Sequence, residues 1–107
     1  MKKEQLAGVL EMLVLRTLSL GPAHGYAIAR HIERLSEDVL KVEQGSLYPA
    51  LDRVLGRGLV TAKWRETPTG RKARYYTITA AGRKRLEERA EEHARIMLAV
   101  QRVMGDA

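Results

Sequence analysis

The chain has 107 residues, 45% of them hydrophobic and 30% charged, a balance that suits one folded, soluble domain with a single core. Cysteine is absent, which excludes disulfides and thiolate metal sites, and no apolar run has the length or flanking charge of a leader or a membrane span. We therefore expect a cytoplasmic protein with no membrane partner, and the net charge of +6 weakly favours an anionic partner such as nucleic acid.

The first predicted helix runs from Leu6 to Leu20. Its apolar residues recur with a helical period, and Met12, Leu15 and Leu20 add a second apolar face. A helix that is apolar nearly all round must be covered on more than one side, and another subunit is one candidate for the second cover. Gly21-Pro22 ends this helix, because proline cannot continue it and glycine tolerates the terminating conformation.

Two shorter helices follow. The second is predicted from His24 to Leu35, with Ile28, Ile32 and Leu35 on one face, and an extended connection through residues 39–42 leads out of it. The third begins at Gly45-Ser46 and stops at the glycines 56 and 58; Pro49 fits its first turn, where a backbone N–H is not needed. Its inward stripe consists of Leu47, Leu51, Val54 and Leu55.

The opposite face of the third helix is free for function. Ser46 and Tyr48 are hydroxyl donors suited to phosphates, and Arg53 has the reach for a phosphate or a guanine edge. Asp52 would repel phosphate, so we expect it to accept a hydrogen bond from a base or to pair with a neighbour. The residues of this face predicted to bind DNA are Ser46, Tyr48, Pro49 and Arg53.

A β-hairpin is predicted next. Residues 59–66 are rich in β-formers and alternate in polarity, residues 67–70 (Thr-Pro-Thr-Gly) signal a turn, and residues 74–79 return as a second strand. Tyr75 and Tyr76 point to opposite faces of that strand, so one of them belongs to the core. For Trp64 we expect a core position beneath the hairpin rather than stacking on a base or ligand.

The hairpin also holds most of the net charge. Residues 59–79 carry five basic side chains against Glu66 alone, which gives +4 of the total of +6. A solvated basic loop is the simpler reading of such a run. Because this run follows a pair of short helices, however, we expect Arg71, Lys72 and Arg74 to contact phosphates.

A long final helix is predicted from an N-cap at Thr79 to about Met104. Its apolar positions lie alternately four and three residues apart, as in the seam of a coiled coil, so the helix is expected to pair with a second copy of the chain. The residues predicted at this dimer interface are Leu86, Ala90, His93, Met97, Val100 and Met104.

His93 is the one ionisable member of that seam. A neutral imidazole can be buried with a hydrogen-bond partner, whereas a charged one is costly without a nearby carboxylate. We therefore consider two hypotheses of similar weight. In the first, protonation of His93 in acid loosens the dimer; in the second, His93 lies in water at the edge of the seam and has no such effect.

The order of the elements is helix, helix, helix, hairpin, long helix, which predicts an α+β, mainly α, winged helix-turn-helix fold of three helices and a two-stranded β-wing. In this fold the third helix enters the major groove of double-stranded DNA and the hairpin lies along phosphates or in the minor groove. We expect residues 1–79 to form the DNA-binding domain and residues 80–107 the dimerisation helix, as parts of one structural unit.

The chain resembles the PadR family of transcriptional regulators. The resemblance rests on six segments in the family's order and spacing, at residues 13–15, 21–26, 45–51, 58–60, 75–79 and 82–83. It implies a winged helix-turn-helix, a dimer built through the C-terminal helix and, usually, repression. Many short members carry a tryptophan in the final helix, near the position of His93, and in some a pair of them holds planar drugs. Here the single tryptophan is Trp64, so the resemblance does not carry over that mode of sensing.

No constellation for catalysis, metal or cofactor binding is evident. Ser46 has no base near it in sequence, and His24 and His31 are not at metal-ligand spacing, so we expect neither an enzyme nor a metalloprotein. The leading hypothesis is a dimeric repressor that binds a palindromic operator, with a small-molecule effector as a further possible partner. The alternative is a winged-helix module for protein–protein contact, or a sensor without direct sequence-specific DNA binding; the basic hairpin favours DNA.

Overall fold

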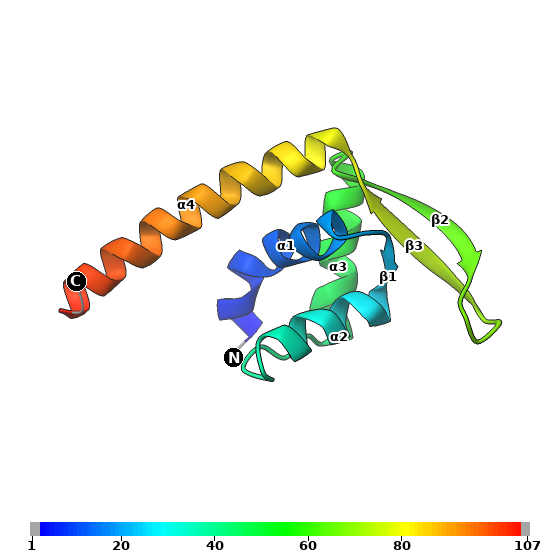
Figure 1. Ribbon diagram of the computed structural model, residues 1–107, viewed down its shortest axis with the longest axis horizontal. Helices are drawn as coiled ribbons and strands as arrows, with labels where there is room; N and C mark the ends of the chain where they lie inside the picture. The colour runs from blue at the N-terminus through cyan, green and yellow to red at the C-terminus, as the bar shows by residue number, and fades with distance from the viewer. Residues whose placement is uncertain (1–2, 106–107) are drawn as a thin grey trace.

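The structure is a computed structural model that describes the backbone of residues 3–105 and the side chains of residues 9–105. Three helices form the body of the molecule, and a hairpin and a fourth helix project from it in opposite directions (Figure 1). In chain order the elements are α1 (Lys3–Ser19), β1 (Ala23–His24), α2 (Gly25–Leu35), α3 (Gln44–Gly56), β2 (Val60–Glu66), β3 (Lys72–Ile78) and α4 (Ala80–Met104).

Helix α1 lies at the centre of the body and contacts every other helix. Leu10, Val14 and Leu18 are buried, as the helical period predicts. Leu15, which belongs to the second predicted apolar face, is also buried within the chain, whereas Leu20 lies just beyond the helix and is 60% exposed. The second apolar face of α1 is therefore covered mostly by this chain itself, because α3 and α4 both pack on α1.

Helix α2 begins at a histidine cap. His24 Nδ1 accepts a hydrogen bond from the backbone N–H of Ala27 at 3.2 Å, which satisfies one of the free donors of the first turn. Ile28 and Ile32 are buried, whereas Leu35, predicted on the same helical face, is 67% exposed. It is the last residue of α2, where the helix has passed the edge of its packing partners.

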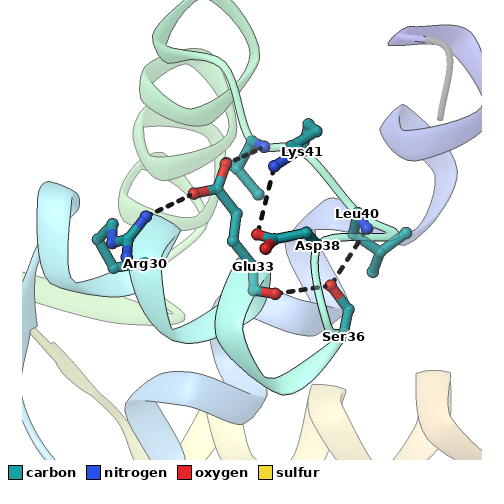
Figure 2. Close-up of polar contacts among 7 residues, drawn as sticks. Arg30, Glu33, Ser36, Asp38, Leu40 and Lys41 are labelled. Atoms are coloured by element: carbon teal, nitrogen blue, oxygen red, sulfur yellow. Dashed lines mark hydrogen bonds and ion pairs between the residues drawn. The ribbon is translucent and has the colours of Figure 1, made fainter.

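The connection from α2 to α3 is a turn held by side chains rather than a simple extended segment (Figure 2). Glu33 accepts a hydrogen bond from the backbone N–H of Val42 at 3.0 Å, and Ser36 Oγ accepts one from the N–H of Leu40 at 3.1 Å. Glu37 and Asp38 adopt the left-handed conformation, with φ of 51° and 64°. This network fixes how α3 leaves α2.

Helix α3 buries Leu47, Ala50, Leu51 and Val54 against the other two helices. It starts at Gln44, which is earlier than predicted, so Pro49 is the sixth helical residue and not part of the first turn. Proline has no N–H to donate at that position, and the hydrogen bond to the carbonyl of Gly45 is therefore missing. Leu55 is only half-buried, at the edge of the core.

The sheet is antiparallel with strand order β1-β3-β2. The predicted hairpin is confirmed, with Val60 opposite Ile78 at its base and Glu66 opposite Lys72 at its tip. The two-residue strand β1 was not predicted, because two residues carry no periodicity; it adds Ala23 opposite Tyr76.

The base of the hairpin is buried and its outer half is not. Val60, Tyr76 and Ile78 face the core, so Tyr76 is the core tyrosine of the predicted pair. The expectation that Trp64 is a core residue is wrong, since its side chain is 67% exposed. Trp64 lies on the same face of the strand as Val60, but the hairpin extends beyond the body before reaching it.

Helix α4 is attached to the base of the hairpin by its first turn. The predicted N-cap is confirmed: Thr79 Oγ1 accepts from the Gly82 N–H at 3.0 Å and donates to the Gly58 carbonyl at 2.8 Å. Gly82 is the buried residue of α4 within residues 80–104, and a Cβ there would clash with the carbonyl oxygen of Leu59. Leu86, about one turn farther along, still packs against the core, and the outer half of the helix runs away from the body (Figure 1).

Candidate nucleic-acid interface

A groove of about 440 Å³ separates α3 from the hairpin. Helix α2 closes one end with Tyr26, which is 70% exposed. The side chains that give the groove its chemistry come from α3 and the two strands: Tyr48, Asp52, Trp64, Lys72 and Arg74, with Tyr76 among the lining residues. The groove therefore combines aromatic surface with basic groups, and it has one carboxylate of its own.

On the α3 side, Tyr48 is fixed by the start of α2. A Cβ added to Gly25 would come within 2.9 Å of Tyr48 Oη and 3.1 Å of the ring, so the absence of a side chain at Gly25 gives the tyrosine its place. Tyr48 nevertheless remains 44% exposed toward the groove. Pro49 and Asp52 are exposed on the same helix, and Ser46 is half-buried near its start.

Arg53 points elsewhere. Its Nε donates to Glu11 Oε2 at 2.9 Å, and Arg57 Nη1 donates to Glu11 Oε1 at 3.0 Å, so one carboxylate of α1 holds two arginines of the α3 end. The structure thus separates Arg53 from Tyr48 and Asp52, with which the sequence pattern grouped it. Arg53 lines no part of the groove described above.

On the hairpin side, all five basic residues of β2, β3 and their turn are exposed. The Arg65 guanidinium lies 4.5 Å from the centre of the Tyr75 ring, and that of Arg74 lies 5.8 Å from the centre of the Tyr76 ring. No ion pair involving these five residues occurs among the side chains of residues 9–105. With Glu66 the one acidic residue of the two strands and their turn, the hairpin keeps an excess of positive charge.

Tyr76 links the hairpin to the core. Burial raises the pKa of its phenol, and the nearby Arg74 guanidinium partly opposes that effect. The phenol is thus neutral at ordinary pH and serves as an apolar support beneath the groove, with Arg74 above it.

Helix α4 presents an apolar surface on its outer half. Leu86, in the first half, packs against this chain's own core, Ala90 is exposed and His93 is half-buried. Farther along, the exposed apolar side chains within residues 9–105 are Ile96, Met97, Leu98, Val100, Val103 and Met104. Their exposed fractions run from 40% for Met97 to 86% for Val103.

The sequence reasoning missed three residues of this region. Tyr26 lines the groove from α2, Lys63 adds basic charge on β2, and Trp64 lines the groove from the hairpin. The signal for Lys63 was the alternation of β2, whereas nothing local in the sequence places Tyr26 beside the hairpin. Among the described residues, no group of three potential ligands is arranged to hold a metal ion, and no helix there has the length and hydropathy to cross a membrane.

The element order and the projecting hairpin define a winged helix-turn-helix fold. The sequence matches the transcriptional regulator PadR-like family over residues 14–88, and the chain belongs to that family. The family resemblance inferred from the sequence motifs is thereby confirmed, as is the fold class.

Solved structures agree with this assignment. A PadR-like transcriptional regulator from Bacillus cereus is 27% identical and superposes with a TM-score of 0.81, covering 95% of this chain and 97% of its own. A transcriptional regulator from Clostridium thermocellum gives a TM-score of 0.84 at 22% identity, covering 92% of this chain and 96% of its own.

Two sequence relatives differ from this chain in length. The transcriptional regulator YqjI of Escherichia coli is 33% identical over 85 residues, which are 79% of this chain and 39% of the relative. An uncharacterised protein in a transposon of Streptomyces fradiae is 41% identical over 89 residues, which are 80% of this chain and 23% of the relative. This chain thus spans less than half of either relative.

Proposed function

We propose that this transcriptional regulator binds double-stranded DNA with sequence specificity, through the groove between α3 and the hairpin. The observation that carries the proposal is the basic hairpin lying beside the exposed face of α3. A surface with an excess of positive charge attracts the phosphate backbone, because neutralising phosphates releases bound counterions. The helix beside it supplies a face that a major groove accommodates.

Within this arrangement the residues divide between sequence reading and backbone contact. Tyr48, Pro49 and Asp52 lie on the exposed side of α3, where they would face base edges and the flanking backbone, and Ser46 donates to a phosphate near the helix start. Arg71, Lys72 and Arg74 neutralise phosphates from the hairpin. We leave Arg53 outside the DNA contact, because Glu11 holds its guanidinium against α1.

We further propose that the protein acts as a dimer formed through α4. The outer half of that helix exposes apolar side chains, from Ile96 to Met104, that the described part of this chain does not cover. Residues 80–107 are then the dimerisation helix and residues 1–79 the DNA-binding domain. Leu86 already packs on its own core, so we place the start of the interface at Ala90. His93, Met97, Val100 and Met104 continue it.

A two-fold dimer presents two α3 helices and two hairpins, which matches a palindromic operator with half-sites about one helical turn apart. Occupancy of a promoter by such a dimer obstructs transcription, so repression is the proposed output, and a cytoplasmic location follows from that role. A small-molecule effector would act by changing the relation of the two subunits.

The test is an in vitro selection from a random duplex library, followed by binding measurements on the selected sequence. We expect a palindrome to be recovered, and a duplex with one half-site to bind far more weakly than the full site. Equal affinity for the half-site, the full site and scrambled DNA would exclude the proposal. A protein that binds no DNA but captures a protein partner through the same surface would instead support the protein–protein module.

A further inference from the structure

Trp64 is the largest side chain of the hairpin that the core does not cover. It is 67% exposed and lies on the strand face that also carries the buried Val60 and the half-buried Ala62. The face of β2 that packs on the core at Val60 is thus exposed at Trp64, where it lines the groove opposite α3. Exposure alone would not single out this indole, because isolated exposed apolar side chains are common on proteins. What points to a binding partner is its position in the groove, opposite Tyr48 and beside basic side chains.

The surroundings of Trp64 indicate which partner. Arg74 is its Cα partner on β3, and the guanidinium of Arg74 lies over the ring of Tyr76 at 5.8 Å from its centre. Lys72 follows two residues away on the same face of β3, and all four residues line the groove opposite Tyr48. The exposed indole of Trp64 therefore lies beside two cations, Arg74 and Lys72. Such a surface is complementary to a partner in which apolar and anionic groups alternate.

We propose that Trp64 contacts the sugar–phosphate backbone of DNA, with its indole ring packed on deoxyribose and its N–H donating to a phosphate oxygen. This deepens the proposed function and rests on it. When α3 occupies the major groove, the DNA strand that borders the groove passes between α3 and the hairpin, where Trp64 lies. The contact adds affinity for any sequence and does not discriminate among bases.

The chain offers a direct readout, since Trp64 is its single tryptophan. The protein is titrated with a duplex of about 30 bp carrying the selected palindrome and, separately, with a scrambled duplex of equal length. With both duplexes we expect the indole emission to change and its quenching by acrylamide, a neutral quencher, to fall.

Binding measurements on variants give the second readout. Trp64→Ala should weaken binding to both duplexes about ten-fold, in line with the usual cost of removing a tryptophan anchor, and Trp64→Phe should recover part of the loss. The slope of log affinity against log salt should stay unchanged, because the indole neutralises no phosphate. Leu35→Ala is the matched control, since Leu35 is also 67% exposed but lies at the far end of α2, outside the groove.

Three results would overturn the inference while leaving the proposed function intact: wild-type affinity of Trp64→Ala, unchanged acrylamide quenching in the DNA complex, or a loss confined to the selected duplex, which would indicate a contact with bases. An altered oligomeric state or melting temperature of Trp64→Ala would also overturn it, by assigning the side chain to packing. Absence of DNA binding by the wild-type protein would instead refute the proposed function itself.

Discussion

The hairpin and the outer half of α4 both project from the three-helix body, but their surfaces have opposite chemistry (Figure 1). The hairpin exposes five basic side chains and an indole, whereas α4 exposes six large apolar side chains from Ile96 to Met104. Neither surface is needed to complete the core of the body. Under the proposed function the two surfaces have separate partners: the basic hairpin binds DNA, and the apolar face of α4 binds a second copy of the chain.

The largest effect is expected from a charged substitution on the apolar face of α4. Val100→Glu places a charge on the α4 seam, and burying it between two subunits would be costly. We expect the dimer to dissociate and affinity for the palindrome to fall about a hundred-fold or more, because linked binding of two half-sites is lost. Ala99→Glu adds the same charge outside the seam and is the control. Light scattering and gel shifts measure the two effects; an intact dimer in Val100→Glu would reject the seam.

The junction between the two projections is the next target. Gly82→Ala puts a methyl group against the Leu59 carbonyl and the Ile78 side chain, so we expect a loss of about 1–3 kcal/mol in the free energy of unfolding. Gly56→Ala is the control, because a Cβ at that helical position meets nothing within 4 Å and should be neutral or slightly stabilising. Chemical denaturation measures both. Equal stability of the two variants would show that the junction tolerates displacement.

Removing charge from the hairpin should act on all DNA alike. Arg71→Ala combined with Lys72→Ala is expected to lower affinity for the palindrome and for scrambled DNA by a similar factor, about ten-fold. It should also reduce the slope of log affinity against log salt by about four, because two phosphate contacts are lost from each of the two hairpins of the dimer. Arg95→Ala with Arg102→Ala removes the same charge from α4 and should leave the slope unchanged. A slope unaffected by the hairpin variant would exclude these residues as phosphate contacts.

The smallest effect is expected at His93, which is half-buried on α4. Protonation would place a charge in the seam, and the neighbouring Glu92 lies within 3.7 Å of Arg89, so it is already engaged. We expect a few-fold weaker dimer at pH 5.5 than at pH 8, and no such difference in His93→Leu. Sedimentation at both pH values measures it, and identical behaviour of the two proteins would place His93 outside the interface.

Much of the fold follows from local sequence signals. The caps at His24 and Thr79 and the turn of the hairpin agree with the residue pattern, because each depends on neighbours a few positions away. The period of a strand assigns a face to Trp64, but the point where the hairpin leaves the body depends on the tertiary arrangement. The strand pattern therefore predicted the correct face for Trp64, but the prediction that its side chain is buried was wrong.

The candidate site illustrates the same limit. Tyr48 and Arg53 both lie off the buried stripe of α3, but they are five residues apart and so lie about 140° apart around the helix, which the sequence prediction did not use. What the sequence does not show is the partner of Arg53: Glu11, 42 residues before it, accepts its Nε–H. Similarly, the place of Tyr48 depends on the bare backbone at Gly25. Contacts between residues so far apart in the sequence leave no periodic pattern from which they could be predicted.

The attachment of α4 has a mechanical consequence. Thr79 and Gly82 join its first turn to the segment that leads into β2, so the start of the helix and the base of the hairpin share one junction. A helix of 25 residues is about 37 Å long. A rotation of about 5° about its far end would displace its first turn by about 3 Å, close to the axial rise of about 3.4 Å per nucleotide of one DNA strand. A slight change in the angle between two paired α4 helices would therefore shift the two hairpins out of phase with successive turns of the double helix.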